Sequence, residues 1–299
     1  PSTVRGLGLG GGSGVARGGG GGHLVRCNHF CVNGEGDAGL GGRGVLLEGG
    51  AMRAVIGTDG DGVDDLAERN VFGSCGHAVY VNANHFNRIS GNYFGFGADG
   101  VTPLANTWGV YMRQTSTRNL VGTDEDGVSD DLERNIIGNC TYGVGLQPIS
   151  FSGTTNRVVG NWIGIDAQGD RALVNTGVYL PDDGAGHVVR GNRIEDTLTG
   201  IRIADGSTVS PTSMCNSISG NTTGLSHEGT EALTLPSNWW GDPTGPSGDG
   251  PGSGDSVVVT GAGSVDWAPW LTAPDETCPY IFADGFDLDY LAPWNTAVP

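Results

Sequence analysis

Two segments of this sequence are nearly identical. Residues 56–73 align with residues 121–138 at an offset of 121 − 56 = 65, and 11 of the 18 aligned positions are identical. The segment 87–95 recurs in the same way at 156–164, with Gly-Asn before an aromatic and an apolar residue in both copies. Self-similarity of this kind is typical of stacked supersecondary units, none of which buries its apolar face alone. The repeat therefore constrains the architecture more than any other feature.

A shorter unit recurs inside the longer one. Strand-like segments of the form Gly-Val-x-apolar and its close variants start at Val45, Val79, Val110, Val144, Val178 and Ile201, at steps of 34, 31, 34, 34 and 23 residues. Most are followed by an Asn-x-apolar and a Gly-Asn-x-apolar segment. Three short strands with tight turns in about 23 residues predict one coil of a parallel β-helix, and longer steps predict the same coil with an insertion of roughly ten residues.

Local chemistry agrees with such a coil. Alternation within a strand directs Val79 and Val81 inward and Tyr80 outward. Glycine permits the positive φ of sharp corners, and asparagine can bond the backbone of a turn and stack on its counterpart in the next coil. We therefore predict an all-β fold, a right-handed single-stranded parallel β-helix of about eight coils with a tryptophan-rich C-terminal cap.

The same pattern divides the chain into four parts. Residues 1–22 form a glycine-rich segment or a degenerate first coil, residues 23–235 the β-helix, residues 236–271 the cap and residues 272–299 a tail. The cap contains four tryptophans, which we expect to cover the last open edge of the solenoid; they are Trp239, Trp240, Trp267 and Trp270.

Composition excludes several classes of protein. The 56 glycines follow no collagen period, and no apolar run is long enough to cross a membrane. The net charge is −18, and all 15 basic residues are arginine, so nucleic acid is not an expected partner. An acidic polysaccharide would also be repelled unless metal ions bridged the two surfaces. The chain starts without methionine and within repeat-like text, which we interpret as a mature or truncated form.

Six scattered cysteines are too few for a disulfide scaffold. Cys75 and Cys140 occupy equivalent repeat positions two coils apart, which is too far for a bond. Two pairings stay open, Cys27 with Cys31 and Cys215 with Cys278.

Two insertions, 57–69 and 122–134, are expected to leave the same corner two coils apart. Both contain Asp-x-Asp-Gly and further carboxylates, and oxygen-rich sites of this kind suit calcium. We predict that Asp59 and Asp61, and likewise Asp124 and Asp126, bind Ca²⁺, although neither loop matches an EF-hand. The alternative is a solvated acidic loop.

The outward position of the Gly-Val-x-apolar strand reads Tyr80, Tyr111, Gly145, Tyr179 and Arg202 in consecutive coils. In register these side chains lie on one face, each about 4.8 Å from the next. Such a row can stack on sugar rings, so we predict that Tyr80, Tyr111, Tyr179 and Arg202 bind carbohydrate. The alternative is that exposed tyrosines simply favour strands.

These motifs resemble bacterial secreted right-handed parallel β-helix proteins of the pectate-lyase-like architecture. The likeness rests on Ile/Val-Gly-Thr-Asp-x-Asp-Gly, Arg-Asn-x-Ile-x-Gly-Asn and Gly-Val-Tyr-Leu units, on the closing segments 238–246 and 265–271, and on an exported-protein tail at 281–286. It covers roughly residues 24–290 and implies export to the extracellular space or cell surface. It implies less about activity, because such proteins include lyases, hydrolases and adhesins.

One group of residues is a candidate catalytic site. Asp182 aligns with Asp205 on the next coil, and two carboxylates about 5 Å apart suit a retaining glycosidase or a metal site. Asp182, Asp183, His187 and Arg202 faintly resemble the site of polygalacturonases, but the Asn-Thr-Asp element is missing and His187 lies too near the aspartates. A lyase-like base would have to be Arg113, Arg190 or Arg202. Aspartates that stabilise turns are the alternative.

Two classes of function follow. We predict a secreted or cell-surface β-helix that binds, or is displayed on, extracellular polysaccharide without catalysis. The alternative is a polysaccharide-degrading enzyme, either a pectate-lyase-like lyase or a polygalacturonase-like hydrolase.

Overall fold

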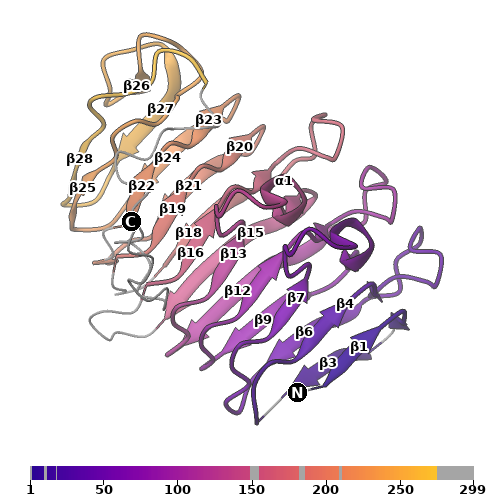
Figure 1. Cartoon of the computed structure of the whole chain (residues 1–299). Coiled ribbons are helices and arrows are strands. Elements are labelled where there is room, and N and C mark those ends of the chain that lie inside the picture. The colour runs from indigo at the N-terminus through magenta and orange to yellow at the C-terminus, as the bar shows by residue number, and fades with distance from the viewer. Residues whose placement is uncertain are drawn as a thin grey trace, which may run out of the picture.

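The computed structural model describes residues 2–9, 12–17, 19–148, 155–181, 186–208 and 211–274. Within them the chain winds through three parallel sheets, here called A, B and C (Figure 1). Neighbouring strands in sheets A and B are three apart in chain order, so three successive strands complete one coil. About eight coils stack in this way, which confirms the expected parallel β-helix.

Each sheet takes one strand from every coil. Sheet A contains β1 (Thr3–Arg5), β4 (Leu24–Arg26), β7 (Val55–Gly57), β10 (Arg88–Ser90), β13 (Leu120–Gly122), β16 (Arg157–Val159), β19 (Val188–Arg190) and β22 (Thr212–Met214). Sheet B contains β2 (Gly8–Leu9), β5 (His29–Phe30), β8 (Val71–Phe72), β11 (Tyr93–Phe94), β14 (Ile136–Ile137), β17 (Trp162–Ile163), β20 (Arg193–Glu195) and β23 (Ser217–Ser219).

Sheet C has the longest strands and is the broadest face. It contains β3 (Gly12–Arg17), β6 (Gly42–Leu47), β9 (His77–Asn82), β12 (Asn106–Gln114), β15 (Cys140–Pro148), β18 (Thr176–Leu180), β21 (Thr199–Ile203), β24 (Thr223–His227), β27 (Gly254–Val259) and β26 (Pro246–Gly248). A separate two-stranded sheet pairs β25 (Ala232–Thr234) with β28 (Ser264–Asp266).

The core consists of apolar side chains that repeat from coil to coil. Val25, Ile56, Ile89, Val121 and Val158 of sheet A are aligned and fully buried. Because Ile89 lies between Ile56 and Val121, the 65-residue repeat spans two coils, as predicted. On sheet B, the ring of Phe72 stacks between Phe30 and Phe94 at centroid distances of 4.8 and 4.9 Å.

An unbroken ladder of buried asparagines forms the corner between sheets A and B. The Nδ2 of each asparagine donates to the Oδ1 of the next one at 2.9–3.1 Å. The members are Asn28, Asn70, Asn92, Asn135, Asn161, Asn192, Asn216 and Asn238. Their amides also accept backbone N–H groups, so the turn satisfies polar atoms that burial would otherwise leave unpaired. The expected stacking of asparagines is confirmed.

Both ends of the solenoid are built from segments of low regularity. The glycine-rich segment 1–22 supplies β1, β2 and β3, which form a first coil. At the other end Trp240 is fully buried, and Trp267 and Trp270 pack against the same core. The predicted tryptophan-rich cap is therefore present. The tail after residue 274 lies outside the described residues.

Candidate functional site

The outer face of sheet C carries the row of side chains that the sequence predicted. Backbone pairing aligns Tyr80 with Tyr111, Tyr111 with Gly145, Gly145 with Tyr179 and Tyr179 with Arg202. All four side chains of this row are partly exposed. Their alignment is as expected, whereas their binding of carbohydrate stays a prediction.

A second row of side chains lies three residues earlier on the same strands. It contains His77, Trp108 and Tyr142 in consecutive coils, and the aligned residue of the next coil is the buried Thr176. Sequence reasoning missed this row because it followed only the position after the first valine. Period-two alternation counted back from Tyr80, Tyr111 and Tyr179 leads to Ala78, Gly109 and Gly177, so it does not predict this row.

Rings from the two rows combine into one continuous stack. Tyr80 lies 5.6 Å from Tyr111, Tyr111 lies 4.2 Å from Trp108, Trp108 lies 4.1 Å from Tyr142, and Tyr142 lies 5.2 Å from Tyr179, all between ring centroids. The guanidinium of Arg202 lies 5.6 Å from the ring of Tyr179 at one end. The planes of Tyr80 and Tyr111 are 15° apart and their centroids 5.6 Å apart, which is an offset-stacked arrangement. Because the rings are offset, each leaves part of its face uncovered.

Glycine at position 145 makes the stack continuous. A Cβ on Gly145 would collide with the indole of Trp108 and approach Cδ2 of Tyr111 to 3.0 Å. Trp108 therefore crosses from its own row into the gap that the missing side chain leaves. Any larger residue at this position would separate the rings on either side.

Polar groups fix the edges of this aromatic strip. Arg202 donates to both carboxylate oxygens of Glu228 at 2.8 and 3.0 Å, and this bond raises the pKa of Arg202 and lowers that of Glu228. The hydroxyl of Tyr111 donates to Gln147. At the other end, burial lowers the pKa of His77, and nearby Arg43 lowers it further. The strip is thus held as a rigid surface that runs along the coil axis.

The candidate catalytic residues do not converge in the described part of the chain. His187 is fully buried, and its Nδ1 accepts the backbone N–H of Asn156 in a ladder that begins with Asn87 and Asn119. Burial lowers the pKa of His187 to about 4, so this ring is neutral at pH 7. Asp205 is exposed beside the Arg202–Glu228 pair. Asp182 and Asp183 lie outside the described residues.

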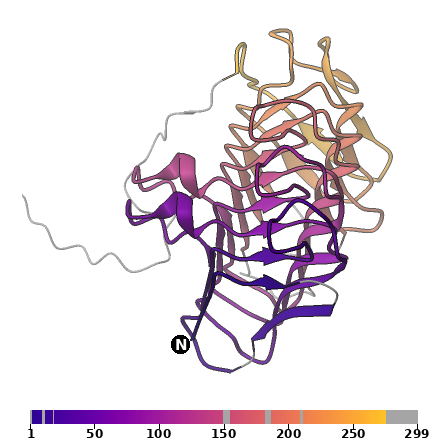
Figure 2. The same cartoon turned by 90° about the vertical axis from the view of Figure 1, so that its right-hand side faces the viewer.

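The two acidic insertions are here called acidic loop 1 (57–69) and acidic loop 2 (122–134). They leave the corner between sheets A and B two coils apart, as predicted, and contain η1 (Asp65–Glu68) and α1 (Asp130–Glu133). Figure 2 shows both short helices projecting from one side of the solenoid. The intervening coil turns tightly through Gly91 and Asn92, so the loops pack on each other.

Both loops use the same hydrogen bonds. Thr58 donates to Asp65 in acidic loop 1, and Thr123 donates to Asp130 in acidic loop 2. Each loop is also fastened by one arginine of the preceding coil. Arg26 pairs with Asp59 and Glu68, and Arg88 pairs with Asp124 and Glu133.

Burial and hydrogen bonding shift the pKa values of Glu133 and Asp65, two carboxyl groups that lie where the loops meet. Glu133 is fully buried, and burial raises its pKa to about 7 even though Arg88 favours the charged form. Burial alone would also raise the pKa of Asp65, but hydrogen bonds from Ser129 and Thr58 outweigh it and lower the pKa. The Ser129 hydroxyl belongs to acidic loop 2, so it bonds the two loops together.

Each loop brings three carboxylates close enough to share a cation. Ligand oxygens of Asp59, Asp61 and Asp65 lie within 4.8 Å of one another, and those of Asp124, Asp126 and Asp130 do the same. Sequence reasoning named two members of each triad and missed Asp65 and Asp130 as ligands. In the described structure the Oδ1 atom of Asp59 is buried and has no hydrogen-bond partner. Three carboxylates fit a hard cation such as Ca²⁺ with water completing its shell, so calcium binding stays a prediction.

A groove of about 680 Å³ borders acidic loop 2 on the side away from acidic loop 1. Glu125, Asp126 and Asp130 form one wall, and Trp162 lies on the floor between the guanidinium groups of Arg134 and Arg193, at 4.6 and 5.1 Å from its ring. The groove is open because the following coils turn from sheet A to sheet B without an insertion.

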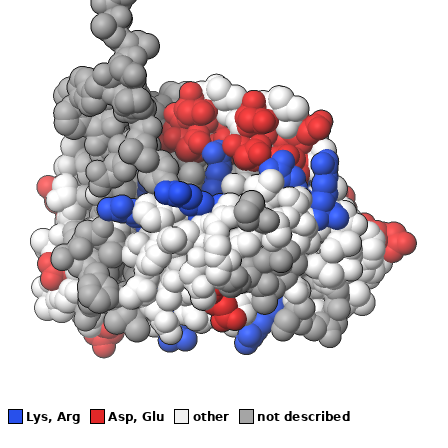
Figure 3. Space-filling model, turned by 60° about the horizontal axis from the view of Figure 1, so that its bottom comes forward, with Lys and Arg blue, Asp and Glu red and all other residues white. Residues whose placement is uncertain are grey.

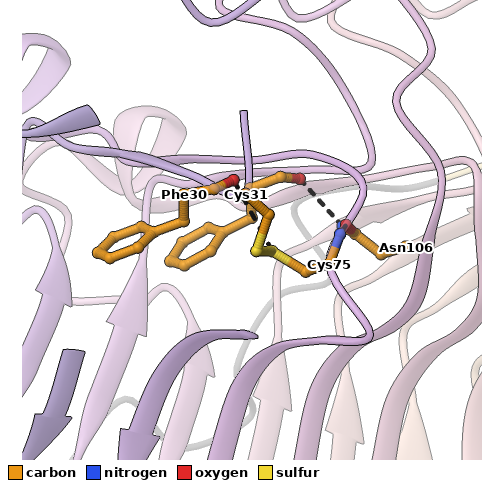
Figure 4. Close-up of a disulfide and its surroundings, with 5 residues drawn as sticks. Phe30, Cys31, Cys75 and Asn106 are labelled. Carbon is orange, nitrogen blue, oxygen red and sulfur yellow. Dashed lines mark hydrogen bonds between the residues drawn. A yellow bond between two sulfur atoms is a disulfide. The ribbon is translucent and has the colours of Figure 1, made fainter. Parts of the chain in front are cut away.

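Cys31 pairs differently from the one predicted alternative that involved it, Cys27–Cys31. Cys31 forms a disulfide with Cys75 (Figure 4), and the Cα atoms of the two residues lie 5.4 Å apart. Cys27 is free. The Cys27–Cys31 alternative is wrong because both residues turn adjacent corners of one coil, whereas Cys75 stacks beside Cys31. Cys215 is also disulfide-bonded, but Cys278 lies outside the described residues. Disulfides are typical of proteins that fold in oxidising compartments.

Comparison with protein-family models, with characterised proteins and with solved structures finds no significant match to this chain. No helical segment in the described part of the chain is long and apolar enough to span a bilayer.

Proposed function

We propose that this protein is an extracellular β-helix of the pectate-lyase-like architecture that binds polysaccharide along sheet C. The observation that carries the proposal is the partly exposed stack from Tyr80 to Tyr179. A surface strip of large aromatic side chains with polar edges is typical of a binding site. The Cys31–Cys75 disulfide supports an extracellular location.

The direction of the strip favours a polymer over a small ligand. The rings come from four consecutive coils, from β9 to β18, and the coils follow one another at about 4.8 Å. Uncovered parts of the offset rings can contact the apolar faces of sugars, while Arg113 and the Tyr111–Gln147 pair supply polar groups beside them. A repeating ligand gains from every coil that it crosses.

For the alternative of a polysaccharide-degrading enzyme, no contact among the described residues brings the candidate catalytic side chains together. His187 is buried, and Arg202 is engaged with Glu228. We therefore propose binding without catalysis as the function of this surface.

Retention on immobilised pectin, alginate, xylan and rhamnan tests the proposal. We expect at least one polymer to retain the wild-type protein, and Tyr111→Ala and Tyr179→Ala to weaken retention about tenfold, since a factor of ten corresponds to about 1.4 kcal/mol. Tyr93→Ala is the matched control, because Tyr93 points outward from sheet B. Equal retention of all three variants would contradict the proposal. Release of unsaturated products or reducing ends by the wild-type protein would favour the enzyme instead.

A further inference from the structure

Acidic loops 1 and 2 expose apolar side chains at their tips. Val63 and Leu66 of acidic loop 1 are 63% and 61% exposed, the highest values among the large hydrophobic residues that the structure describes, and Val128 of acidic loop 2 is 44% exposed. A Cβ on Gly62 would lie 3.6 Å from Cγ1 of Val128, so the two loops meet next to these side chains. We call Val63, Leu66 and Val128 the tip patch. Exposed apolar groups gathered at one point and rimmed by polar groups are typical of an interaction surface.

The rim of the tip patch is negatively charged. Asp61, Asp64, Asp126 and Asp131 are all exposed around it, and the side chain of Asp131 is 88% exposed. Figure 3 shows carboxylates gathered along one edge of the molecule with arginines directly beneath them.

The arginines of this region are engaged below the rim. The side chains of Arg26 and Arg88 are 12% and 19% exposed and pair with carboxylates at the base of the loops. Arg69 lies 4.1 Å from the ring of Tyr93, whereas Arg134 lies over Trp162 and also pairs with Asp131 of the rim at 2.9 Å. Among the described residues no arginine forms an ion pair with Asp61, Asp64 or Asp126, and Asp64 also lies outside both carboxylate triads, so its charge projects outward even when the triads hold a cation.

We propose that the tip patch and its rim form a docking surface for a cationic amphipathic segment of a partner protein. Apolar side chains of the segment cover Val63, Leu66 and Val128, while its basic side chains pair with the rim carboxylates. Removing the apolar tips from water stabilises the complex, and charge complementarity favours one orientation and speeds association. This surface lies at the corner between sheets A and B, apart from the aromatic strip on sheet C.

The negative charge of the rim favours a cationic partner segment over other partners. A second copy of the chain carries 33 acidic and 15 basic residues and presents the same negative rim, so it is repelled. Nucleic acids and anionic lipid surfaces are repelled for the same reason. A neutral apolar partner would leave the exposed carboxylates facing a desolvated surface, which costs free energy.

Binding of a designed peptide tests the proposal. The probe is a short helical peptide with leucine on one face and lysine on the other, and the same peptide with glutamate in place of lysine is its control. We expect Val63→Ser/Leu66→Ser and, separately, Asp64→Asn/Asp131→Asn to weaken binding of the lysine peptide about tenfold. These variants leave the carboxylate triads of both loops unchanged.

Matched variants elsewhere on the surface separate a docking surface from general attraction. Leu40→Ser/Leu198→Ser removes exposed leucines away from the loops, and Glu35→Gln/Glu48→Gln removes the same number of charges. These should stay within about twofold of the wild-type affinity. The proposal is overturned if control and tip variants weaken binding equally, or if the glutamate peptide binds as well as the lysine peptide. It is also overturned if anionic vesicles, but not the lysine peptide, bind through the tip patch.

Discussion

The indole of Trp108 occupies the space above Gly145, one coil further along sheet C. This relationship joins two rows of aromatic side chains into one stack. Trp108 lies between the rings of Tyr111 and Tyr142, at 4.2 and 4.1 Å, and so connects the N-terminal and C-terminal parts of the strip. The continuity of the aromatic stack therefore depends on the absence of a side chain at Gly145.

We expect Gly145→Ala to disturb the strip. Its added Cβ must displace the indole, which costs about 1 kcal/mol or more of unfolding free energy through overpacking. Near-ultraviolet circular dichroism should change because the rings move apart. Gly34→Ala is the control, since no atom lies within 4 Å of its added Cβ and its φ is not positive. An unchanged aromatic spectrum for Gly145→Ala would show that Trp108 does not occupy this gap.

The asparagine ladder should contribute strongly to stability. Asn135 donates to the carbonyl of Ile89 and to Asn161, and it accepts both the backbone and side-chain N–H of Asn92. Asn135→Ala leaves several buried groups unpaired, and we expect a loss of about 2–4 kcal/mol of unfolding free energy in urea. Gln114→Ala, at an exposed position, should change it by less than about 0.5 kcal/mol. Similar values for the two variants would contradict a structural role for the ladder.

Buried His187 should make the protein acid-sensitive. Its pKa falls from 6.5 to about 4 on folding, so the unfolded chain binds the proton more tightly. Stability from this group is complete above pH 6.5 and is lost as the pH falls toward 4, by up to about 3 kcal/mol. His187→Asn extends the asparagine ladder that precedes it and should remove this part of the pH dependence. Parallel curves of unfolding free energy against pH for wild type and variant would disprove the assignment.

Glu133 should act in the opposite direction. Its pKa rises from 4.5 to about 7 on folding, so the folded chain binds the proton more tightly. Its contribution to stability therefore grows as the pH falls from 7 toward 4.5. We expect Glu133→Gln to remove this rise, measured as the difference between the urea unfolding curves of wild type and variant at pH 7 and pH 5. Glu35→Gln, on the exposed surface, is the control variant.

The Cys31–Cys75 disulfide should stabilise the N-terminal coils. The bridged residues are 44 apart, and closing a loop of that length stabilises the folded state by about 4 kcal/mol in the chain-entropy account. Cys31→Ala/Cys75→Ala should therefore lower the melting temperature, whereas Cys27→Ser should not, because Cys27 is free and exposed. Non-reducing peptide mapping checks the pairing directly, and a Cys27–Cys31 peptide would refute it.

Calcium should bind both carboxylate triads. We expect calorimetry to detect binding heat and the melting temperature to rise with calcium, because a ligand of the folded state stabilises it. Asp65→Asn and Asp130→Asn should each remove one site, while Asp99→Asn, outside the loops, should leave both intact. If the wild-type protein shows no binding heat and no rise in melting temperature with calcium, the prediction of calcium binding is wrong.

Predictions from sequence succeeded where they depended on local periodicity. Alternation along Gly-Val-x-apolar segments and the spacing of Gly-Asn turns led directly to the coil, its register and the asparagine ladder. The common corner of acidic loops 1 and 2 followed from the same repeat. These features need only that equivalent residues meet their counterparts one coil later, which the parallel register guarantees.

Local periodicity could not predict contacts between side chains of different rows or different corners of the coil. The Cys31–Cys75 bond joins residues whose coils carry different insertions, so their alignment depends on how each insertion folds. The burial of His187 likewise depends on its place at the end of an asparagine ladder, and its motif context gave no sign of this.

The sequence by itself determined that this chain winds into coils and which faces of its strands point inward, because both follow from a period of two and from turn residues at fixed intervals. Only the tertiary structure decided how Trp108 fills the gap at Gly145, how Arg88 fastens acidic loop 2 and how the loop tips meet. Side-chain direction depends on the volume left by neighbours more than thirty residues away, and no local pattern records that volume.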